Sequence, residues 1–236
     1  DTQLARELAL SLVHNLAWNP QDFAERIGRL FGEDRIVGRG RATQNAADRI
    51  LSGVPWYEAG EPSPSAGNGA AMRAAPIGLD FLEPAERLRI ADEQAGVTHL
   101  DLRSRAAAVL VADVVADALV NHARTDSADW YEHLASRVRP LDPALADCLP
   151  RVPKWLESGN GLADAEIAKC GNVPLGSAHQ FEAWHGISPF ATPSVLYALY
   201  AFARNPESAE DVLKTAVSVG GDVDTVGAMA GAMVGA

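Results

Sequence analysis

Residues 106–120 read AAAVLVADVVADALV, the most apolar stretch of the chain. A helix made of this stretch is apolar on nearly every side, which is typical of a helix buried in a protein core. At about 1.5 Å per residue it is too short to cross a bilayer core of about 30 Å, and it also contains Asp113 and Asp117. We therefore expect a long buried helix that begins at Asp101 and ends near His122, and no membrane association.

Helical periodicity continues on both sides of this stretch. Leucine repeats at every fourth position from Leu4 to Leu16, which places one apolar stripe on one helix face. We expect further helices from Pro20, over residues 42–51, from Pro84 to about residue 91, and in the windows 195–202, 209–219 and 226–236. Residues 140–189 are rich in proline and glycine and are expected to be irregular. The sequence has no convincing strand pattern or internal repeat, so it predicts an all-α fold.

The composition is that of a folded globular protein. The chain has 236 residues, enough for one domain with a full core, and 47% of them are hydrophobic and 22% charged. Its net charge of −11 argues against broad binding to nucleic acid or anionic lipid, because both require basic side chains that neutralise phosphates. The two cysteines, Cys148 and Cys170, are far apart in sequence and lack zinc-binding spacing, so we expect neither a disulfide nor a zinc site. A reducing cytoplasm is the expected location, and the oligomeric state stays open.

The sharpest local motif is GGDVDT at residues 220–225, between two helical windows. Two glycines allow a tight turn, after which Asp222, Asp224 and Thr225 present two carboxylates and a hydroxyl at a helix start. Oxygen ligands of this kind suit a hard cation such as Mg²⁺ or Mn²⁺. The alternative is that one aspartate simply caps the last helix, where acidic residues are also favoured by the helix dipole. Glycine recurs at every fourth position of the helix that follows, which predicts that this helix packs closely against its neighbours.

Three segments of the chain resemble the ADP-ribosylglycohydrolase family. The GGDVDT motif and its small-residue helix resemble the family's C-terminal signature, although the family commonly has threonine where Val223 stands. GNGAAMRAAP at residues 67–76 is similar to the family's glycine-rich substrate loop, and Thr98-His99 is similar to a pair that precedes a long alanine-rich helix. The order and spacing of the three segments agree across nearly the whole chain. The resemblance implies a single domain over residues 1–236, folded as a compact orthogonal multi-helix bundle.

The first residues give a partial fourth match. Asp1-Thr2-Gln3 resembles the second half of a Thr-Asp-Asp-Thr motif whose first three residues bind metal in the family. The resemblance implies that a threonine and an aspartate precede Asp1. It also implies that the domain as given lacks an N-terminal helix, which carries a glutamate near the scissile bond in the family.

The resemblance implies hydrolysis of the glycosidic bond between ADP-ribose and an acceptor. Two Mg²⁺ ions, with Mn²⁺ as the alternative, would offset the repulsion among carboxylates, orient the distal ribose and lower the pKa of the water that attacks the anomeric carbon. The implied metal ligands are Asp1, Asp222, Asp224 and Thr225. The implied catalytic base is Asp1 or Asp222, and the substrate is ADP-ribose or an ADP-ribosylated conjugate.

The substrate-binding residues that the resemblance implies are Ser65, Gly67, Asn68, Gly69 and His99. A glycine-rich turn before a helix exposes backbone N–H groups, which can bind the diphosphate without a cluster of basic side chains. Taken alone, residues 67–69 would be an ordinary turn and His99 an ordinary histidine at a helix start. Arg73 is expected to anchor the loop by an ion pair. We predict that residues 65–69 and Asp222 lie on the same cleft.

Five ring-bearing residues lie near expected loops and could stack on adenine, although most buried aromatic residues belong to cores. They are Trp56, Tyr57, Trp184, His185 and Phe190. The sequence does not choose between them.

Two other classes of protein stay open. Lens J1-type crystallins resemble the family without a demonstrated need for hydrolysis, but a structural role predicts loss of the carboxylates that this chain retains. A phosphoesterase on a helical scaffold could use the same aspartates, and measuring phosphate release against ADP-ribose release would separate the two classes. The acceptor is open as well, since arginine, serine, a nucleic-acid base, a small molecule or an O-acetyl group are all compatible.

Overall fold

The computed structural model describes residues 1–121, 125–171 and 185–236, and every regular element in these ranges is a helix. The β-type contacts within the same ranges are isolated bridges. The helices are α1 (Thr2–Asn15), α2 (Pro20–Gly32), α3 (Arg41–Leu51), α4 (Trp56–Ala59), α5 (Ala75–Asp80), α6 (Pro84–Gly96), α7 (Leu102–Asn121), α8 (Ala128–Val138), α9 (Pro143–Cys148), η1 (Leu149–Arg151), α10 (Val152–Glu157), α11 (Asn160–Ile167), α13 (Ala191–Arg204), α14 (Ala209–Ser218) and α15 (Val223–Val234). The all-α prediction is confirmed.

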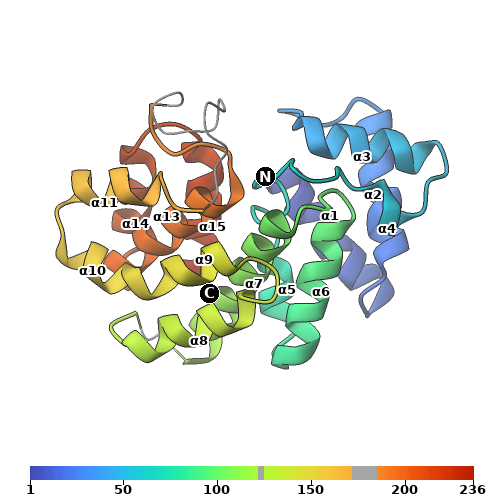
Figure 1. Cartoon of the computed structure of the whole chain (residues 1–236). Helices are drawn as coiled ribbons and strands as arrows, with labels where there is room; N and C mark the ends of the chain where they lie inside the picture. Colours follow the sequence, from blue (N-terminus) through green and yellow to red (C-terminus); the bar gives the residue numbers. More distant parts are fainter. Residues whose placement is uncertain (122–124, 172–184) are drawn as a thin grey trace.

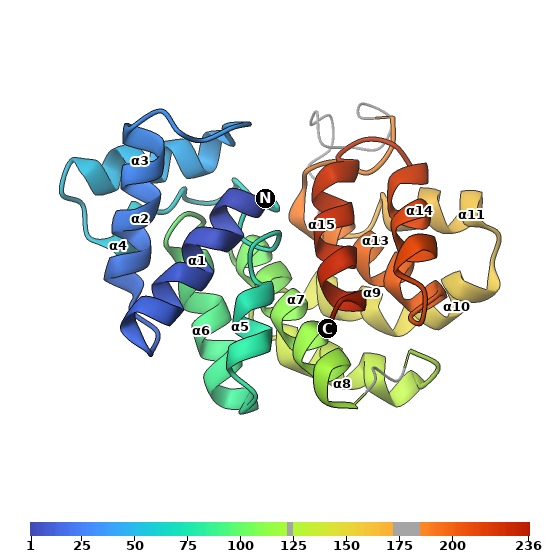
Figure 2. The same ribbon diagram turned by 180° about the vertical axis from the view of Figure 1, so that it is seen from behind.

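The helices form two groups with a central layer between them. Figure 1 shows α1–α4 in blue on one side, α13–α15 in orange to red on the other, and α5–α7 in green between the two. Figure 2 shows the same arrangement from behind, with α1 in front of the first group and α15 facing it across the central layer. The first and last helices of the chain therefore face each other although they are far apart in sequence.

Helix α7 is the centre of the molecule. It packs against α5, α6, α8, α13 and α15, and its residues from 106 to 116 are all buried. Its bounds agree with the buried helix expected after Asp101, while His122, where we expected the end, lies outside the described residues. No helix in the described part of the chain is both long enough and apolar enough to span a membrane.

Helix starts follow the signals in the sequence. Helix α2 begins at Pro20, and the side chain of Asn19 accepts a hydrogen bond from the backbone N–H of Asp22 at 3.1 Å. Helix α6 begins at Pro84, and the Glu83 carboxylate accepts one from the backbone N–H of Glu86 at 2.8 Å. These bonds satisfy N–H groups that have no partner inside the first turn of a helix.

The prediction that residues 140–189 are irregular is wrong for the first half of the stretch. Residues 143–167 form α9, η1, α10 and α11. Prolines stand in the first turn of α9, η1 and α10, where a missing N–H costs no hydrogen bond, so here they begin helices instead of breaking them. Asp142 also caps α9, because its carboxylate accepts from the backbone N–H of Ala144 at 3.0 Å. Residues 172–184 lie outside the described part of the chain.

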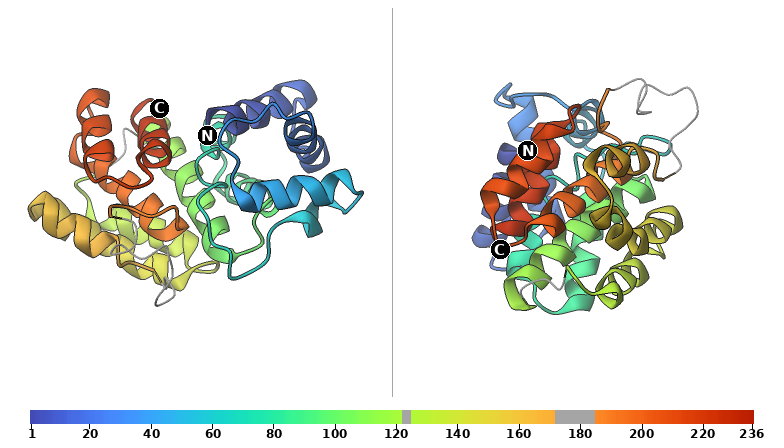
Figure 3. Two further views of the ribbon diagram at one scale, coloured as in Figure 1. Left: turned by 90° about the horizontal axis from the view of Figure 1, so that it is seen from above. Right: turned by 90° about the vertical axis from the view of Figure 1, so that its left-hand side faces the viewer.

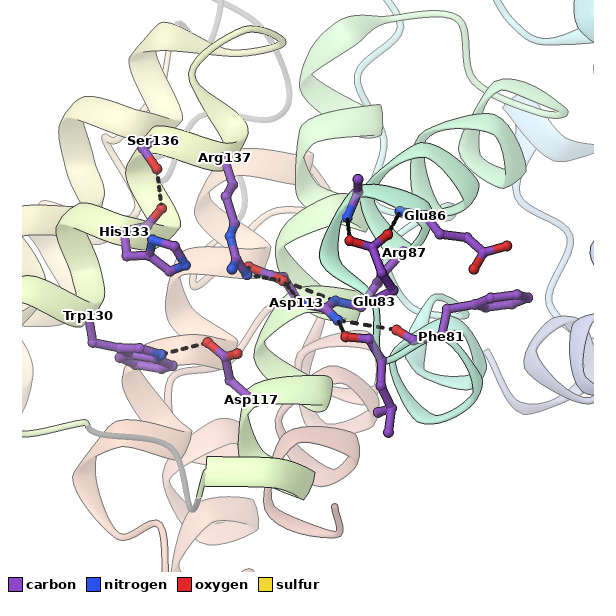
Figure 4. A network of polar contacts seen from close by, with 12 residues as sticks. Phe81, Glu83, Glu86, Arg87, Asp113, Asp117, Trp130, His133, Ser136 and Arg137 are labelled. Carbon is purple, nitrogen blue, oxygen red and sulfur yellow. Dashed lines mark hydrogen bonds and ion pairs between the residues drawn. The ribbon is translucent and has the colours of Figure 1, made fainter.

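A buried network of charged side chains joins α6, α7 and α8 (Figure 4). Asp113 on α7 accepts hydrogen bonds from Nη2 and Nε of Arg87 on α6, at 2.6 and 3.0 Å, and from Nη1 of Arg137 on α8. The side chains of Asp113 and Arg87 are only 1% and 2% exposed. Arg87 also donates to the carbonyl groups of Phe81 and Leu82. The network therefore fixes α6, which ends just before His99, against the central helix.

Candidate active site

One cleft takes residues from both ends of the chain. Its volume is about 720 Å³, within the usual range for a small-molecule site. Its lining includes Asp1, Leu4, residues 36–43, residues 61–69, His99, Pro189, Phe190, Asp222, Asp224 and Thr225. In the left view of Figure 3, as in Figures 1 and 2, the N-terminus lies between the blue helices and α15. All four expected metal ligands lie in this lining, and so do the residues expected to bind the substrate through the glycine-rich loop and its neighbour, which are Ser65, Gly67, Asn68, Gly69 and His99.

The turn before α15 depends on two glycines. Gly220 and Gly221 have φ angles of +76° and +83°, a region that residues with a Cβ rarely adopt. A Cβ on Gly221 would lie 2.1 Å from the carbonyl oxygen of Ile187, which shows how closely the two backbones approach. The backbone N–H of Asp222 donates to that oxygen at 2.8 Å, and the N–H of Ile187 donates to the carbonyl of Gly220 at 3.1 Å. These contacts hold Asp222 at the start of α15 and at the edge of the cleft.

The Asp222 side chain is not used as a helix cap. It makes no capping hydrogen bond although Asp222 holds the N-cap position of α15. Instead Asp222 accepts a hydrogen bond from Nδ2 of Asn68 at 2.5 Å. Burial raises the pKa of Asp222, and so does the nearby charge of Asp224, whereas hydrogen bonds from Asn68 and Thr225 oppose the rise. Two carboxylates therefore stand next to each other in a partly desolvated place, which is costly unless a proton or a cation offsets their charge.

Asp1 lines the same cleft as Asp222 and Asp224. Among the described residues no three His, Cys, Asp or Glu side chains converge closely enough to hold a metal ion as they stand. The acidic pair of Asp222 and Asp224, with the Thr225 hydroxyl and the Asp1 carboxylate on the same cleft, nevertheless offers only oxygen donors and unneutralised negative charge. This donor set fits a hard divalent cation in type.

Asn68 ties the glycine-rich loop to the acidic turn. Besides its bond to Asp222, its Nδ2 donates to Oγ of Ser194 at 3.0 Å, and Ser194 donates to the carbonyl of Ser188 at 2.8 Å. The backbone N–H of Asn68 donates to the carbonyl of Pro189 at 3.1 Å. The prediction that residues 65–69 and Asp222 share one cleft is confirmed.

The loop does not run directly into a helix as expected. The N–H groups of Ala71 and Met72 bond to the carbonyl of Asn68 and form turns, and α5 begins only at Ala75. Gly67 and Gly69 therefore lie well outside the first turn of α5, which is only six residues long, so the helix dipole gives no support to a diphosphate at the loop. Any anion at Gly67 and Gly69 would depend on the backbone of the loop and on His99.

Arg73 supports the loop from beneath, but not by the expected ion pair. Its side chain is completely buried, and its hydrogen-bond partners within the described residues are all neutral. It donates to the carbonyl of Gly69 at 3.0 Å, to the side chain and carbonyl of Gln94, and to Oγ1 of Thr98 at 2.7 Å. Burial lowers the pKa of Arg73 to about 9. The guanidinium also lies over the ring of Phe23, with 5.4 Å from Cζ to the ring centroid.

The contacts of Thr98 suit one tautomer of His99. Oγ1 of Thr98 lies 2.8 Å from Nδ1 of His99. Thr98 accepts from Arg73 and can direct its hydroxyl hydrogen to Nδ1, an arrangement in which the ring proton is on Nε2. A Cβ added to Gly67 would lie 3.5 Å from that Nε2, so the nitrogen faces the loop. Burial first, and then the charge of Arg73, lower the pKa of His99 to about 3, and the ring is a neutral N–H donor at the cleft.

Replacement of Thr98 by valine is expected to remove this ordering. Thr98→Val keeps the volume but deprives Arg73 of an acceptor and Nδ1 of its donor, so we expect a loss of about 1–3 kcal/mol in the free energy of unfolding. ¹⁵N NMR of the His99 ring should show that the Nε2–H tautomer is no longer dominant, and urea unfolding gives the stability. Thr192→Val is the matched control, since Thr192 is also fully buried but its hydroxyl contacts Asp142. An unchanged His99 spectrum in Thr98→Val would show that the hydrogen bond from Thr98 does not determine the tautomer of His99.

Among the described aromatic candidates, Phe190 is the one in the cleft lining. Its ring is 5.0 Å from the guanidinium carbon of Arg103 and is almost fully buried. The lining does not include Trp56, Tyr57 or His185. Trp184 lies outside the described residues.

The sequence analysis missed one wall of the cleft. Residues 36–42 form this wall between α2 and α3, and they include Arg39 and Arg41. Arg39 forms an ion pair with Asp34 and lies over the ring of Phe31. The signal that could have found it is the alternating Gly-Arg-Gly-Arg at residues 38–41, which is unusual between two helices.

This all-helical chain, with an Asp-rich turn and a glycine-rich loop on one cleft, is a member of a family of hydrolases. The chain belongs to the ADP-ribosylglycohydrolase family, whose family model matches residues 1–236. It is 28% identical over 257 residues to the ADP-ribosylhydrolase ARH3 of Gallus gallus, covering 100% of this chain and 68% of that protein. It is 30% identical over 243 residues to an uncharacterised protein of Archaeoglobus fulgidus, covering 100% of this chain and 70% of that protein.

The fold of the chain is also similar to a solved structure. An ADP-ribosylglycohydrolase-related protein complex matches with a TM-score of 0.69 and 28% sequence identity, over 99% of this chain and 69% of the other. The orthogonal multi-helix bundle expected from the sequence motifs is therefore the fold of this family.

Proposed function

We propose that this protein hydrolyses the glycosidic bond between the distal ribose of ADP-ribose and an acceptor group. The observation that carries the proposal is the hydrogen bond between Asn68 and Asp222, which places the glycine-rich loop and the acidic turn on one nucleotide-sized cleft. The family and the relatives named ADP-ribosylhydrolase support it.

The acidic turn would serve the reacting end of the substrate. Water attacks the anomeric carbon through a transition state with oxocarbenium character, and a carboxylate near that carbon removes a proton from the water. Asp222 suits this role because burial raises its pKa toward the working pH and Asn68 fixes one of its oxygens. Asp1 is the alternative base on the same cleft.

Asp1, Asp222, Asp224 and Thr225 would hold Mg²⁺, with Mn²⁺ as the alternative. Bound there, the ion would supply positive charge between the carboxylates and lower the pKa of a water molecule. The protein's own part is to present the oxygen donors from a rigid helix start, which Gly220 and Gly221 position. We expect an absolute need for a divalent cation on this basis.

The loop would hold the other end of the substrate. Ser65, Gly67 and Gly69 offer backbone groups to the diphosphate, and the neutral Nε2–H of His99 donates to a substrate oxygen. Since His99 stays neutral over the whole physiological range, its contribution is expected to be independent of pH there.

Product analysis in H₂¹⁸O tests this function. The full-length protein is incubated with Mg²⁺ and with proteins ADP-ribosylated on serine or, separately, on arginine. We expect free ADP-ribose labelled at the anomeric carbon, and no product after treatment with EDTA. Release of AMP or of labelled phosphate would make the protein a phosphoesterase. Binding of ADP-ribose without any turnover of either substrate would favour a non-catalytic, crystallin-like role.

A further inference from the structure

The fold brings the two cysteines of the chain together. Cys148 is the last residue of α9, and Cys170 follows α11. Their thiols lie within hydrogen-bonding distance of each other, and both side chains are almost completely buried. Both cysteines are free, and they lie near each other although they are far apart in sequence, because the chain returns to the end of α9 after η1, α10 and α11.

The two cysteines lie beside the guanidinium group of Arg151. Nη1 of Arg151 is 3.7 Å from Sγ of Cys170, and Nη2 of the same side chain pairs with Glu166 at 3.1 Å. The Arg151 guanidinium also stacks over the ring of Trp155, at 5.0 Å from the centroid, and Trp155 donates to the same Glu166 carboxylate. Arg151 is therefore anchored on two sides next to the sulfur atoms.

The surroundings favour one thiolate in the pair. Hydrogen bonds from the Cys170 thiol and from the backbone N–H of Gly171, with the charge of Arg151, lower the pKa of Cys148 to about 7 against the opposing effect of burial. The pKa of Cys170 is raised by its hydrogen bond with Cys148 and by burial, and its thiol also donates to the carbonyl of Glu166 at 3.4 Å. A nucleophilic thiolate thus faces a protonated thiol, which is the arrangement that disulfide formation requires.

We propose that Cys148 and Cys170 are a site of reversible oxidative modification, at which a two-electron oxidant such as hydrogen peroxide forms an intramolecular disulfide. The Cys148 thiolate attacks one peroxide oxygen, which breaks the O–O bond, gives a sulfenic acid and releases hydroxide that is protonated to water. Cys170 then attacks that sulfur, and the sulfenic oxygen leaves as a second water. Two thiols and one hydrogen peroxide give one disulfide and two waters, so the two electrons lost by sulfur reduce the peroxide.

The bond would close a loop that runs from Cys148 through η1, α10 and α11 to Cys170. It joins the end of α9 to the residue before Gly171, and a Cβ on Gly171 would lie only 2.6 Å from the Thr192 side chain at the start of α13. Oxidation would thus tie α9 to the segment that packs against α13. Constraint of the unfolded chain is the expected source of added stability.

The test compares the reduced and oxidised forms of the full-length protein. After treatment with the thiol oxidant diamide, or with hydrogen peroxide, we expect no titratable thiol under denaturing conditions, and a tryptic peptide with Cys148 joined to the peptide with Cys170. Differential scanning fluorimetry should show a melting temperature that is higher by roughly 5–10 °C and returns to its starting value in dithiothreitol. The rate of thiol loss should rise as pH increases through about 7.

Variants separate a reactive pair from two buried thiols. Cys148→Ser and Cys170→Ser should show no rise in melting temperature with oxidant. Arg151→Gln should slow thiol loss by roughly threefold or more, whereas Arg139→Gln, which removes an exposed ion pair to Asp147, should leave the rate unchanged. The proposal is overturned if the folded wild-type protein keeps both thiols, if the disulfide forms only between chains, or if oxidation lowers the melting temperature. Since the wild-type protein alone gives these outcomes, a variant that fails to fold does not prevent the decision.

Discussion

Asp113→Asn is expected to lower the free energy of unfolding by about 3–5 kcal/mol. The substitution keeps the shape of the side chain but removes the one negative charge that Arg87 and Arg137 share (Figure 4). Arg87 would then stay buried with its charge uncompensated, because its remaining hydrogen-bond partners in the described part of the chain are the carbonyl groups of Phe81 and Leu82. Urea unfolding followed by circular dichroism measures the loss.

Asp117→Asn is the matched control for this prediction. Asp117 lies one turn further along α7, is less buried and accepts a hydrogen bond from the Trp130 indole at 2.9 Å, which an asparagine oxygen can also accept (Figure 4). We expect a cost of about 1 kcal/mol or less for the control. Equal losses for the two variants would mean that the charge of Asp113 is not what holds α6 and α8 to α7.

The fold could be predicted where the pattern of apolar residues decides it. Residues 106–120 are apolar on all sides, and they form the central helix that the pattern predicts. Residues 143–167 were assigned wrongly because the same residue type has two opposite effects. Proline breaks a helix when it stands in the interior but is favoured in the first turn. The sequence around Pro150 and Pro153 does not show which of these two positions each proline occupies.

The candidate site could be predicted only as separate pieces. GGDVDT and GNG are local motifs, and each was recognised by itself. The contact that unites them joins Asn68 to Asp222 across most of the chain, and it depends on how α15 packs against the central layer. The chain of hydrogen bonds from Arg73 through Thr98 to His99 could not be predicted either. A hydroxyl group can donate or accept, and only the folded structure shows which partners it has.

Asp224→Asn is expected to abolish most of the activity that we propose, with a fall of at least about 100-fold in kcat/KM. Asparagine has nearly the same volume and can still occupy the first turn of α15, so a purely structural role for Asp224 predicts little change. If Asp224 instead holds a divalent cation beside Asp222, loss of one anionic oxygen donor weakens the cation at the cleft. Calorimetric titration with Mg²⁺ and ADP-ribose release, compared at equal helicity, distinguish the two roles.

Asp129→Asn makes the comparison specific to the cleft. Asp129 also stands in the first turn of a helix, α8, and it is not among the residues that line the cleft, so its replacement carries the same change in charge and in helix-dipole interaction. We expect Asp129→Asn to keep both Mg²⁺ affinity and turnover. Wild-type behaviour of Asp224→Asn in both measurements would show that Asp224 only favours the helix start, and the metal would then have to be sought elsewhere on the cleft. Parallel losses in Asp224→Asn and Asp129→Asn would point to net charge or to the helix-dipole interaction as the cause, because these are the changes that the two variants share.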